Sequence, residues 1–201
     1  MIDRKMSRKA RVERKTKETS IEVELDLDGR GAGLIDTGIP FLDHMLDHLS
    51  KHSLIDIDLK ATGDLEIDGH HTTEDVGLCL GQALSEALGE KRGIVRYGYA
   101  SIPMNEALVD VSLDISGRPF CVFDSERLAG KVGDFDAELA EEFLRALANK
   151  AGLTVHVTVK RGSNIHHIIE AMFKALARAL GQAVRLDPRI EGAIPSTKET
   201  L

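Results

Sequence analysis

The sequence contains one short motif, His-His-x-x-Glu, in two places. It reads His70, His71 and Glu74 in the first copy and His166, His167 and Glu170 in the second. Residues four apart on a helix lie on one face, about 5–6 Å apart, so each outer His–Glu pair can bind one metal ion. The second histidine of each motif is rotated by about 100° and faces away from that pair. We therefore predict two ions, each bound by one pair and by the neighbouring histidine of the other motif.

Aligning the two copies also places His44 opposite Glu142 on an earlier helix. We expect one site to contain His44, His71, His166 and Glu170, and the other to contain Glu142, His70, Glu74 and His167. The set has five imidazoles, three carboxylates and no thiolate. Such ligands suit a six-coordinate ion such as Mn²⁺ better than a tetrahedral structural Zn²⁺. The sequence thus predicts two Mn²⁺ per active site.

The alternative is that the histidines are polar helix-capping residues copied with the rest of a repeat. Retention of ligand-type residues at the same places in two diverged copies favours metal binding. His48 is either a surface residue or a partner of a ligand, and the surface position is favoured. His156 lies in an alternating strand and is expected to have no ligand role.

The chain around these motifs is duplicated. Residues 17–30 align without a gap on residues 105–118, and both stretches alternate apolar and polar side chains before a glycine turn. In each half a helical pattern then leads into a strand and a second helix. The sequence predicts an α+β fold of two similar halves, each a mostly antiparallel sheet with helices on one face. We place the halves at about 8–93 and about 94–187, with a tail at 188–201.

Composition sets the class of protein. With 201 residues, 42% hydrophobic and 29% charged, the chain is typical of a globular protein, and it has no long apolar segment or signal peptide. Cys79 and Cys121 are expected to be reduced thiols in a soluble cytoplasmic protein. The basic first seventeen residues are either a nucleic-acid arm or a solvated strand edge, and the strand edge is favoured. We predict neither a nucleic-acid nor a membrane partner.

Four segments resemble the imidazole glycerol-phosphate dehydratase family: FLDHMLDHLSKHS, DGHHTTEDVGLCLGQAL, SNIHHIIEAMFKALARAL and the tail IPSTKETL. The resemblance runs from about Arg8 to Leu201. It implies two similar halves that each contain a βαβ unit, a homo-oligomer of 24 subunits, and di-manganese sites between subunits. Two positions depart from the family pattern, which has a histidine where Glu142 stands and an acidic residue where Asn105 stands.

The resemblance also implies a reaction, the elimination of water from imidazole glycerol phosphate to give imidazole acetol phosphate in histidine biosynthesis. Metal coordination of the imidazole ring would help to expel hydroxide, and a positioned side chain would move the proton. By resemblance this side chain is Glu18, which also contacts the substrate, and its counterpart in the second half is Glu106. The residues implied to bind the phosphorylated substrate are His52, Arg96, Arg118, Lys174, Ser196, Thr197 and Lys198.

Two other functions use the same histidines and glutamates. A dinuclear hydrolase of phosphoesters would use a metal-bound hydroxide, and aspartate ligands would then be expected. A metal-storage or metal-stabilised assembly protein would leave Glu18, Arg96 and Arg118 without a role. Substitution of Glu18 would then have no chemical consequence.

Overall fold

The computed structural model describes residues 8–123, 128–190 and 192–201. Its main feature is a pair of four-stranded sheets with equivalent strand orders, β1-β2-β4-β3 and β5-β6-β10-β7. The first sheet contains β1 (Lys9–Lys15), β2 (Thr19–Asp26), β3 (Ile35–Asp36) and β4 (Asp56–Gly63). The second contains β5 (Tyr97–Met104), β6 (Ala107–Asp114), β7 (Phe120–Phe123) and β10 (Thr154–Arg161), and β8 (Lys131–Val132) pairs with β9 (Phe135–Asp136) in a separate hairpin.

The strands of both sheets follow the alternation of apolar and polar residues in the sequence. In β2, Ile21, Val23 and Leu25 are buried while the residues between them are exposed, as expected for a strand with one face on the core. The neighbours β1, β2 and β4 pair antiparallel, and β3 pairs parallel with β4. The second sheet repeats this, with β7 parallel to β10. Each half therefore contains the expected βαβ unit.

The helices are α1 (Pro40–Ser53), α2 (His70–Leu88), α3 (Leu139–Ala151) and α4 (Ile165–Ala183), and a 3-10 turn, η1 (Pro188–Ile190), follows α4. Helix α1 begins with Pro40, whose fixed φ suits a first helical position, and buries Leu42, Met45 and Leu49 on one face. Helix α4 begins after Asn164, whose side chain accepts a hydrogen bond from the backbone N–H of His167. The cap of α4 is thus an asparagine and not one of the histidines.

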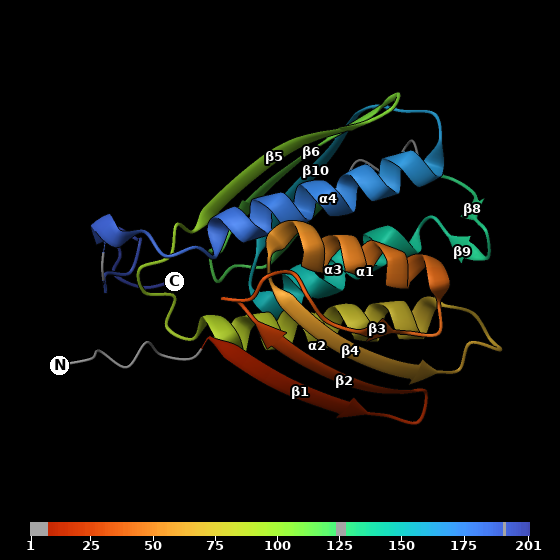
Figure 1. Cartoon of the computed structure of the whole chain (residues 1–201), viewed down its shortest axis with the longest axis horizontal. Coiled ribbons are helices and arrows are strands. Elements are labelled where there is room, and N and C mark those ends of the chain that lie inside the picture. Colours follow the sequence, from red (N-terminus) through yellow and green to blue (C-terminus); the bar gives the residue numbers. More distant parts are fainter. Residues whose placement is uncertain (1–7, 124–127, 191) are drawn as a thin grey trace.

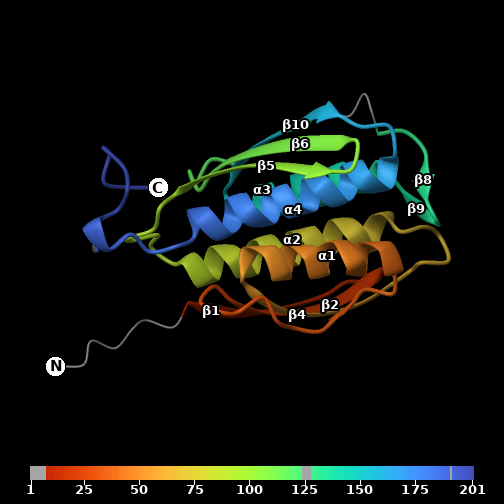
Figure 2. The same ribbon diagram turned by 45° about the horizontal axis from the view of Figure 1, so that its top comes forward.

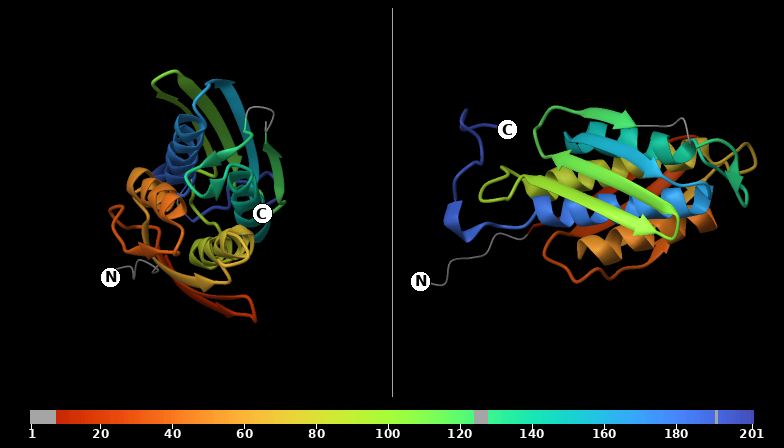
Figure 3. Two further views of the ribbon diagram at one scale, coloured as in Figure 1. Left: turned by 90° about the vertical axis from the view of Figure 1, so that its right-hand side faces the viewer. Right: turned by 90° about the horizontal axis from the view of Figure 1, so that it is seen from above.

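All four helices lie between the two sheets (Figures 1 and 2). Seen along the long axis, α1 and α2 cover the first sheet, while α3 and α4 cover the second (Figure 3). Across the middle, α1 packs on α4 and α2 packs on α3. This arrangement confirms the predicted α+β fold of two similar halves, and it places the two His-His-x-x-Glu motifs on the two long helices α2 and α4. The residue boundaries of the two halves, about 8–93 and about 94–187, stay a prediction.

The ends of the chain pack differently. Strand β1 is an edge strand with most of its side chains exposed, and the basic residues that precede it, at positions 1–7, lie outside the described residues. The tail after α4 folds back on the segment between α2 and β5, where Gly93 N–H donates to Ala193 O at 2.7 Å. Cys79 and Cys121 are both free thiols. No helix in the described part of the chain is long and apolar enough to cross a membrane.

Candidate active site

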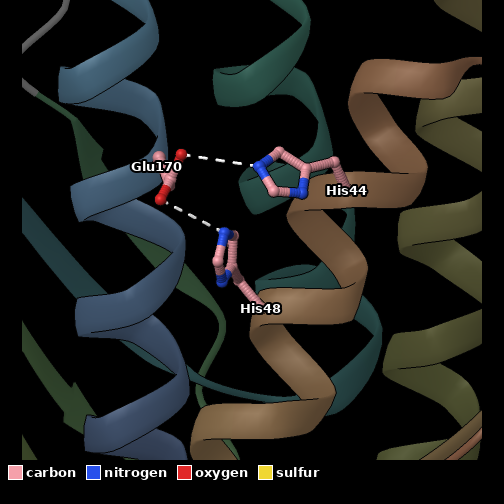
Figure 4. A group of neighbouring side chains, drawn as sticks. All are labelled: His44, His48 and Glu170. Carbon is pink, nitrogen blue, oxygen red and sulfur yellow. Dashed lines mark ion pairs between the residues drawn. The ribbon is translucent and has the colours of Figure 1, made fainter.

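Four ligand-type side chains gather where α1 packs on α4, and we call them the α1–α4 cluster: His44, His48, His166 and Glu170. Glu170 is at its centre (Figure 4). One carboxylate oxygen lies 3.0 Å from His166 Nε2 and 3.5 Å from His44 Nε2, and the other lies 3.2 Å from His48 Nε2. The second oxygen also accepts a hydrogen bond from Lys174 Nζ at 2.5 Å. Three imidazoles and one carboxylate from two helices therefore converge.

The spacing of residues on the two helices produces this convergence. His44 and His48 are four residues apart on α1, and His166, Glu170 and Lys174 are four apart on α4, so each set forms a row along its helix. Their neighbours Met45, Leu49 and Ile169 are buried in the core and hold the two rows against each other. The Glu170 side chain is only 8% exposed. The rows face each other because the apolar residues beside them fix the rotation of both helices.

The charges of the cluster favour metal binding. Burial acts to raise the pKa of Glu170, but hydrogen bonds from Lys174 and His166 outweigh it and bring that pKa down to about 2. Burial lowers the pKa of His48 to about 4, despite the nearby Glu170 carboxylate. At neutral pH the cluster thus holds an ionised carboxylate beside a neutral imidazole. These are the protonation states in which both groups coordinate metals.

One atom in the cluster lacks a conventional partner. His48 Nε2 is buried and makes no hydrogen bond to any described residue, although it lies 3.2 Å from Glu170. Potential ligand atoms of His44, His48 and Glu170 all lie within 4.8 Å of one another. Imidazole and carboxylate ligands without a thiolate fit a divalent ion of borderline or hard character, Mn²⁺ among them. The residues present therefore fit the predicted metal.

The remaining predicted ligands lie elsewhere in the chain. His71 is on α2, where its Nδ1 lies 3.0 Å from the Asp64 carboxylate, and His167 Nδ1 lies 2.7 Å from Glu106. The His167 ring lies edge-on to that of His166, with centroids 6.2 Å apart, but within the described ranges neither His71 nor His167 makes a hydrogen bond or ion pair with the α1–α4 cluster. His70 and Glu74 are at the start of α2, and Glu142 is at the start of α3. Among the described residues these three make no ion pair with one another.

Catalytic and substrate residues predicted from the sequence are also dispersed. Glu18 is exposed in the turn between β1 and β2, and its charge contributes to the raised pKa of His71 after the larger effect of Asp64. Two of the predicted phosphate ligands lie beside the α1–α4 cluster, since the His52 ring stacks on His48 and Lys174 bonds Glu170. Arg118 is exposed in the turn after β6.

The tail lies at the other end of α4. Arg96 makes hydrogen bonds of 2.7 and 3.1 Å to the Asp114 carboxylate and donates to Pro195 O at 2.7 Å, which anchors the tail. Ser196, Thr197 and Lys198 follow Pro195 directly. Helix α4 ends at Ala183, seventeen residues after His166. This separation corresponds to about 26 Å of helix, so the tail and the α1–α4 cluster of one chain are far apart.

A family profile for imidazoleglycerol-phosphate dehydratase matches residues 37–180. The imidazoleglycerol-phosphate dehydratase of Acetivibrio thermocellus is 58% identical over 196 residues, which are 98% of this chain and 100% of the relative. That of Symbiobacterium thermophilum is 57% identical over 96% of this chain and 93% of the relative. The chain belongs to the imidazoleglycerol-phosphate dehydratase family.

Solved structures from the family agree with the fold. The enzyme of Staphylococcus aureus superposes with a TM-score of 0.81 at 42% identity, covering 89% of this chain and 99% of that one. The enzyme of Pyrococcus furiosus, in complex with (S)-C348, gives a TM-score of 0.82 at 39% identity over 94% and 100% of the two chains. The architecture of two sheets around four helices is therefore that of the family.

Sequence reasoning missed one member of the α1–α4 cluster. It favoured a surface position for His48, which is wrong, because the side chain is 19% exposed and its Nε2 is buried. The signal was present in the spacing, since His44, His48 and His52 recur every four residues along α1. The contact between Asp64 and His71 was missed as well, because it depends on the conformation of the loop that joins β4 to α2.

Proposed function

We propose that this chain is an imidazoleglycerol-phosphate dehydratase that eliminates water from imidazole glycerol phosphate to give imidazole acetol phosphate in histidine biosynthesis, with two Mn²⁺ per active site. The observation that carries the proposal is the convergence of His44, His48 and Glu170 in a chain of this family. A cytoplasmic location stays a prediction from the sequence.

The proposed metal ligands are those predicted from the repeat, His44, His70, His71, Glu74, Glu142, His166, His167 and Glu170, with His48 added by its geometry. Bound Mn²⁺ would supply Lewis acidity and a template for the imidazole ring. The protein's own contribution is to hold ionised Glu170 and neutral His48 ready for ligation on two helices fixed by the core. Such preorganisation lowers the cost of binding both metal and substrate.

Glu18 is the proposed acid/base. It is exposed at the end of the β1–β2 hairpin, near His71, and a carboxylate at this place can take the proton from the carbon next to the ring and return it. The substrate phosphate is assigned to His52, Arg96, Arg118, Lys174, Ser196, Thr197 and Lys198. Lysine and arginine are suited to this dianion because they form charge-assisted hydrogen bonds.

These residues do not meet in one chain. The tail lies about 26 Å along α4 from His166, and the Nδ1 atoms of His71 and His167 bond Asp64 and Glu106 rather than a member of the α1–α4 cluster. A site that uses all of them needs residues from neighbouring copies. We therefore propose that the active form is a homo-oligomer, with 24 subunits as the family resemblance implies, whose sites lie between subunits.

The deciding experiment is a steady-state assay for the ketone product from imidazole glycerol phosphate, with metal-stripped protein before and after addition of Mn²⁺. Turnover that depends on Mn²⁺ is expected. Tight Mn²⁺ binding without turnover would reject the dehydratase and favour storage, and release of inorganic phosphate would favour the hydrolase.

A second test concerns the tail. Deletion of residues 195–201 should raise KM for the phosphorylated substrate much more than it lowers the melting temperature, because the tail packs on the surface and contributes little to the core. A deletion variant with an unchanged KM would remove the tail from the site. Arg96→Lys serves as the companion variant, since Arg96 anchors the tail through Pro195 O.

A further inference from the structure

Asp64 and Glu106 hold equivalent histidines in the two halves of the chain. We propose that they are positioning residues that fix the tautomer and orientation of His71 and His167 for metal binding, and that this arrangement leaves Glu18 free for proton transfer. The inference rests on the proposed function. These positioning roles explain why only the first half supplies an acid/base, although the two halves have the same fold.

In the first half the carboxylate comes from the loop after β4. The two Asp64 oxygens lie 3.0 and 3.3 Å from His71 Nδ1, and the Asp64 side chain is 15% exposed. An ionised carboxylate only accepts hydrogen bonds, so Nδ1 must carry the proton. When the ring is neutral, as a metal ligand must be, the lone pair is then on Nε2, the ring nitrogen that is not bonded to Asp64. Carboxylates that orient a histidine ligand in this way are common around metal sites.

In the second half the carboxylate comes from the two-residue turn between β5 and β6. Glu106 Oε2 lies 2.7 Å from His167 Nδ1, while Oε1 accepts hydrogen bonds from the backbone N–H groups of Asn164 at 2.9 Å and Ser163 at 3.3 Å. Three donors therefore fix this carboxylate, and His167 is again left with its lone pair on Nε2. The turn itself begins at Asn105, which adopts φ 49°, a conformation that asparagine tolerates well.

The two halves thus use different positions for the same task. The turn after β10 reads Gly162, Ser163 and Asn164, so it offers no carboxylate where the first half has Asp64. Glu106 fills that role, although by the alignment of residues 17–30 on 105–118 it is the counterpart of Glu18. Glu18 is not needed there, because Asp64 already holds His71.

The Glu18 carboxylate, in contrast, is not held in place by a bonding partner among the described residues. Its backbone N–H bonds Thr16 Oγ1, but its carboxylate has no hydrogen-bond or ion-pair partner within the described ranges. A proton-transfer group must be available to substrate, whereas a group that orients a ligand must be held. Glu18 and Glu106 meet these two opposite requirements from equivalent places in the repeat.

The test is Mn²⁺ titration of the metal-stripped, full-length assembled protein, followed by isothermal calorimetry or by the electron paramagnetic resonance signal of free Mn²⁺. Asp64→Ala removes the acceptor at His71. Glu106→Gln can keep its backbone bonds through Oε1 but then presents an amide N–H to Nδ1, which favours the wrong tautomer. Each variant should weaken Mn²⁺ binding at one of the two sites about 10–100-fold and leave the other site tight.

Two variants serve as controls. Asp26→Ala removes a carboxylate whose exposure, 21%, is close to the 15% of Asp64. Asp26 pairs with Lys9 and contacts no histidine in the described part of the chain, so this variant should bind both ions as the parent does. Glu18→Gln should also bind both ions normally and yet lose turnover. Glu106→Gln, at the equivalent position, should instead weaken Mn²⁺ binding. Thermal melts of all variants should stay close to the parent, because partly exposed ion pairs contribute little to stability.

Parent-like Mn²⁺ affinity in both Asp64→Ala and Glu106→Gln would overturn the inference, and parent-like affinity in one of them would overturn the role of that residue. These outcomes are separate from failure of the proposed function. In that case the parent itself would show no Mn²⁺-dependent turnover, whatever the variants bind.

Discussion

The two helix pairs at the centre of the molecule occupy equivalent places in the duplication, yet they differ in what they hold. Between α1 and α4, polar side chains converge on Glu170. Between α2 and α3, the helices approach closely through glycines: a Cβ on Gly77 would lie 2.8 Å from Ala146 Cβ, and one on Gly81 would lie 2.7 Å from Leu147 O. The first interface gathers side chains that could bind a metal ion, and the second is closely packed.

The difference arises from a few replacements along the aligned helices. His44 and His48 on α1 correspond to Glu142 and Ala146 on α3, so the second interface has a methyl group where the first has an imidazole. Duplication therefore copied the backbone and the His-His-x-x-Glu motif but not the surroundings of the motif. A ligand-type residue at an equivalent position does not by itself make an equivalent site within one chain.

The largest effect is expected at Glu170. Glu170→Gln removes the charge on which the α1–α4 cluster converges, so one tight equivalent of Mn²⁺ should be lost and kcat should fall by roughly 100-fold or more, since even the outer partners of metal ligands are worth 10–100-fold. Mn²⁺ titration and steady-state kinetics measure both. Glu141→Gln, at a carboxylate that pairs with Arg145 on α3, is the matched control and should change neither.

Glu74→Gln sharpens the comparison, because Glu74 is the counterpart of Glu170 in the other motif. If neighbouring copies complete the second site, this variant should lose the other equivalent of Mn²⁺ in the assembled protein. Normal binding of two ions by Glu74→Gln would mean that the copied motif on α2 has no metal role.

Much of the fold was predictable because the signals are local and occur twice. The alternation through Ile21, Val23 and Leu25 and the helical spacing of Met45 and Leu49 each predict an element with one buried face, and the second half repeats the order. Each strand or helix predicted in one half is then supported by the element predicted at the aligned position of the other half. No contact between distant residues is needed for this step.

The site was less predictable because it depends on contacts across the core. The row of His44 and His48 was visible in the sequence, but the burial of His48 Nε2 follows from how α1 rotates against α4. The pairing of Glu106 with His167 joins a hairpin turn to a helix sixty-one residues later. Such contacts are set by loop conformations that the alternating and helical patterns do not describe.

A pH-dependent effect of intermediate size is expected at His48. Since its pKa falls from 6.5 to about 4 on folding, the unfolded chain takes up a proton here before the folded chain does. The free energy of unfolding of metal-free protein should therefore decrease as the pH falls from 6.5 towards 4, by up to about 3 kcal/mol from this residue. Urea unfolding of parent and His48→Gln across this range measures the effect. The variant should show the smaller slope, and an equal slope in parent and variant would remove His48 as the cause.

The smallest effect tests the close-packed interface. Gly77→Ala places a methyl group 2.8 Å from both Ala146 Cβ and Phe143 O, so α2 and α3 must move apart. Overpacking costs about 1–3 kcal/mol, and the better helix propensity of alanine returns about 1 kcal/mol, which leaves a loss of about 1 kcal/mol in urea unfolding. Gln82→Ala, at an exposed position on the same helix, should be neutral or slightly stabilising. A Gly77→Ala variant as stable as Gln82→Ala would show that α2 and α3 tolerate separation and that their interface does not depend on close packing.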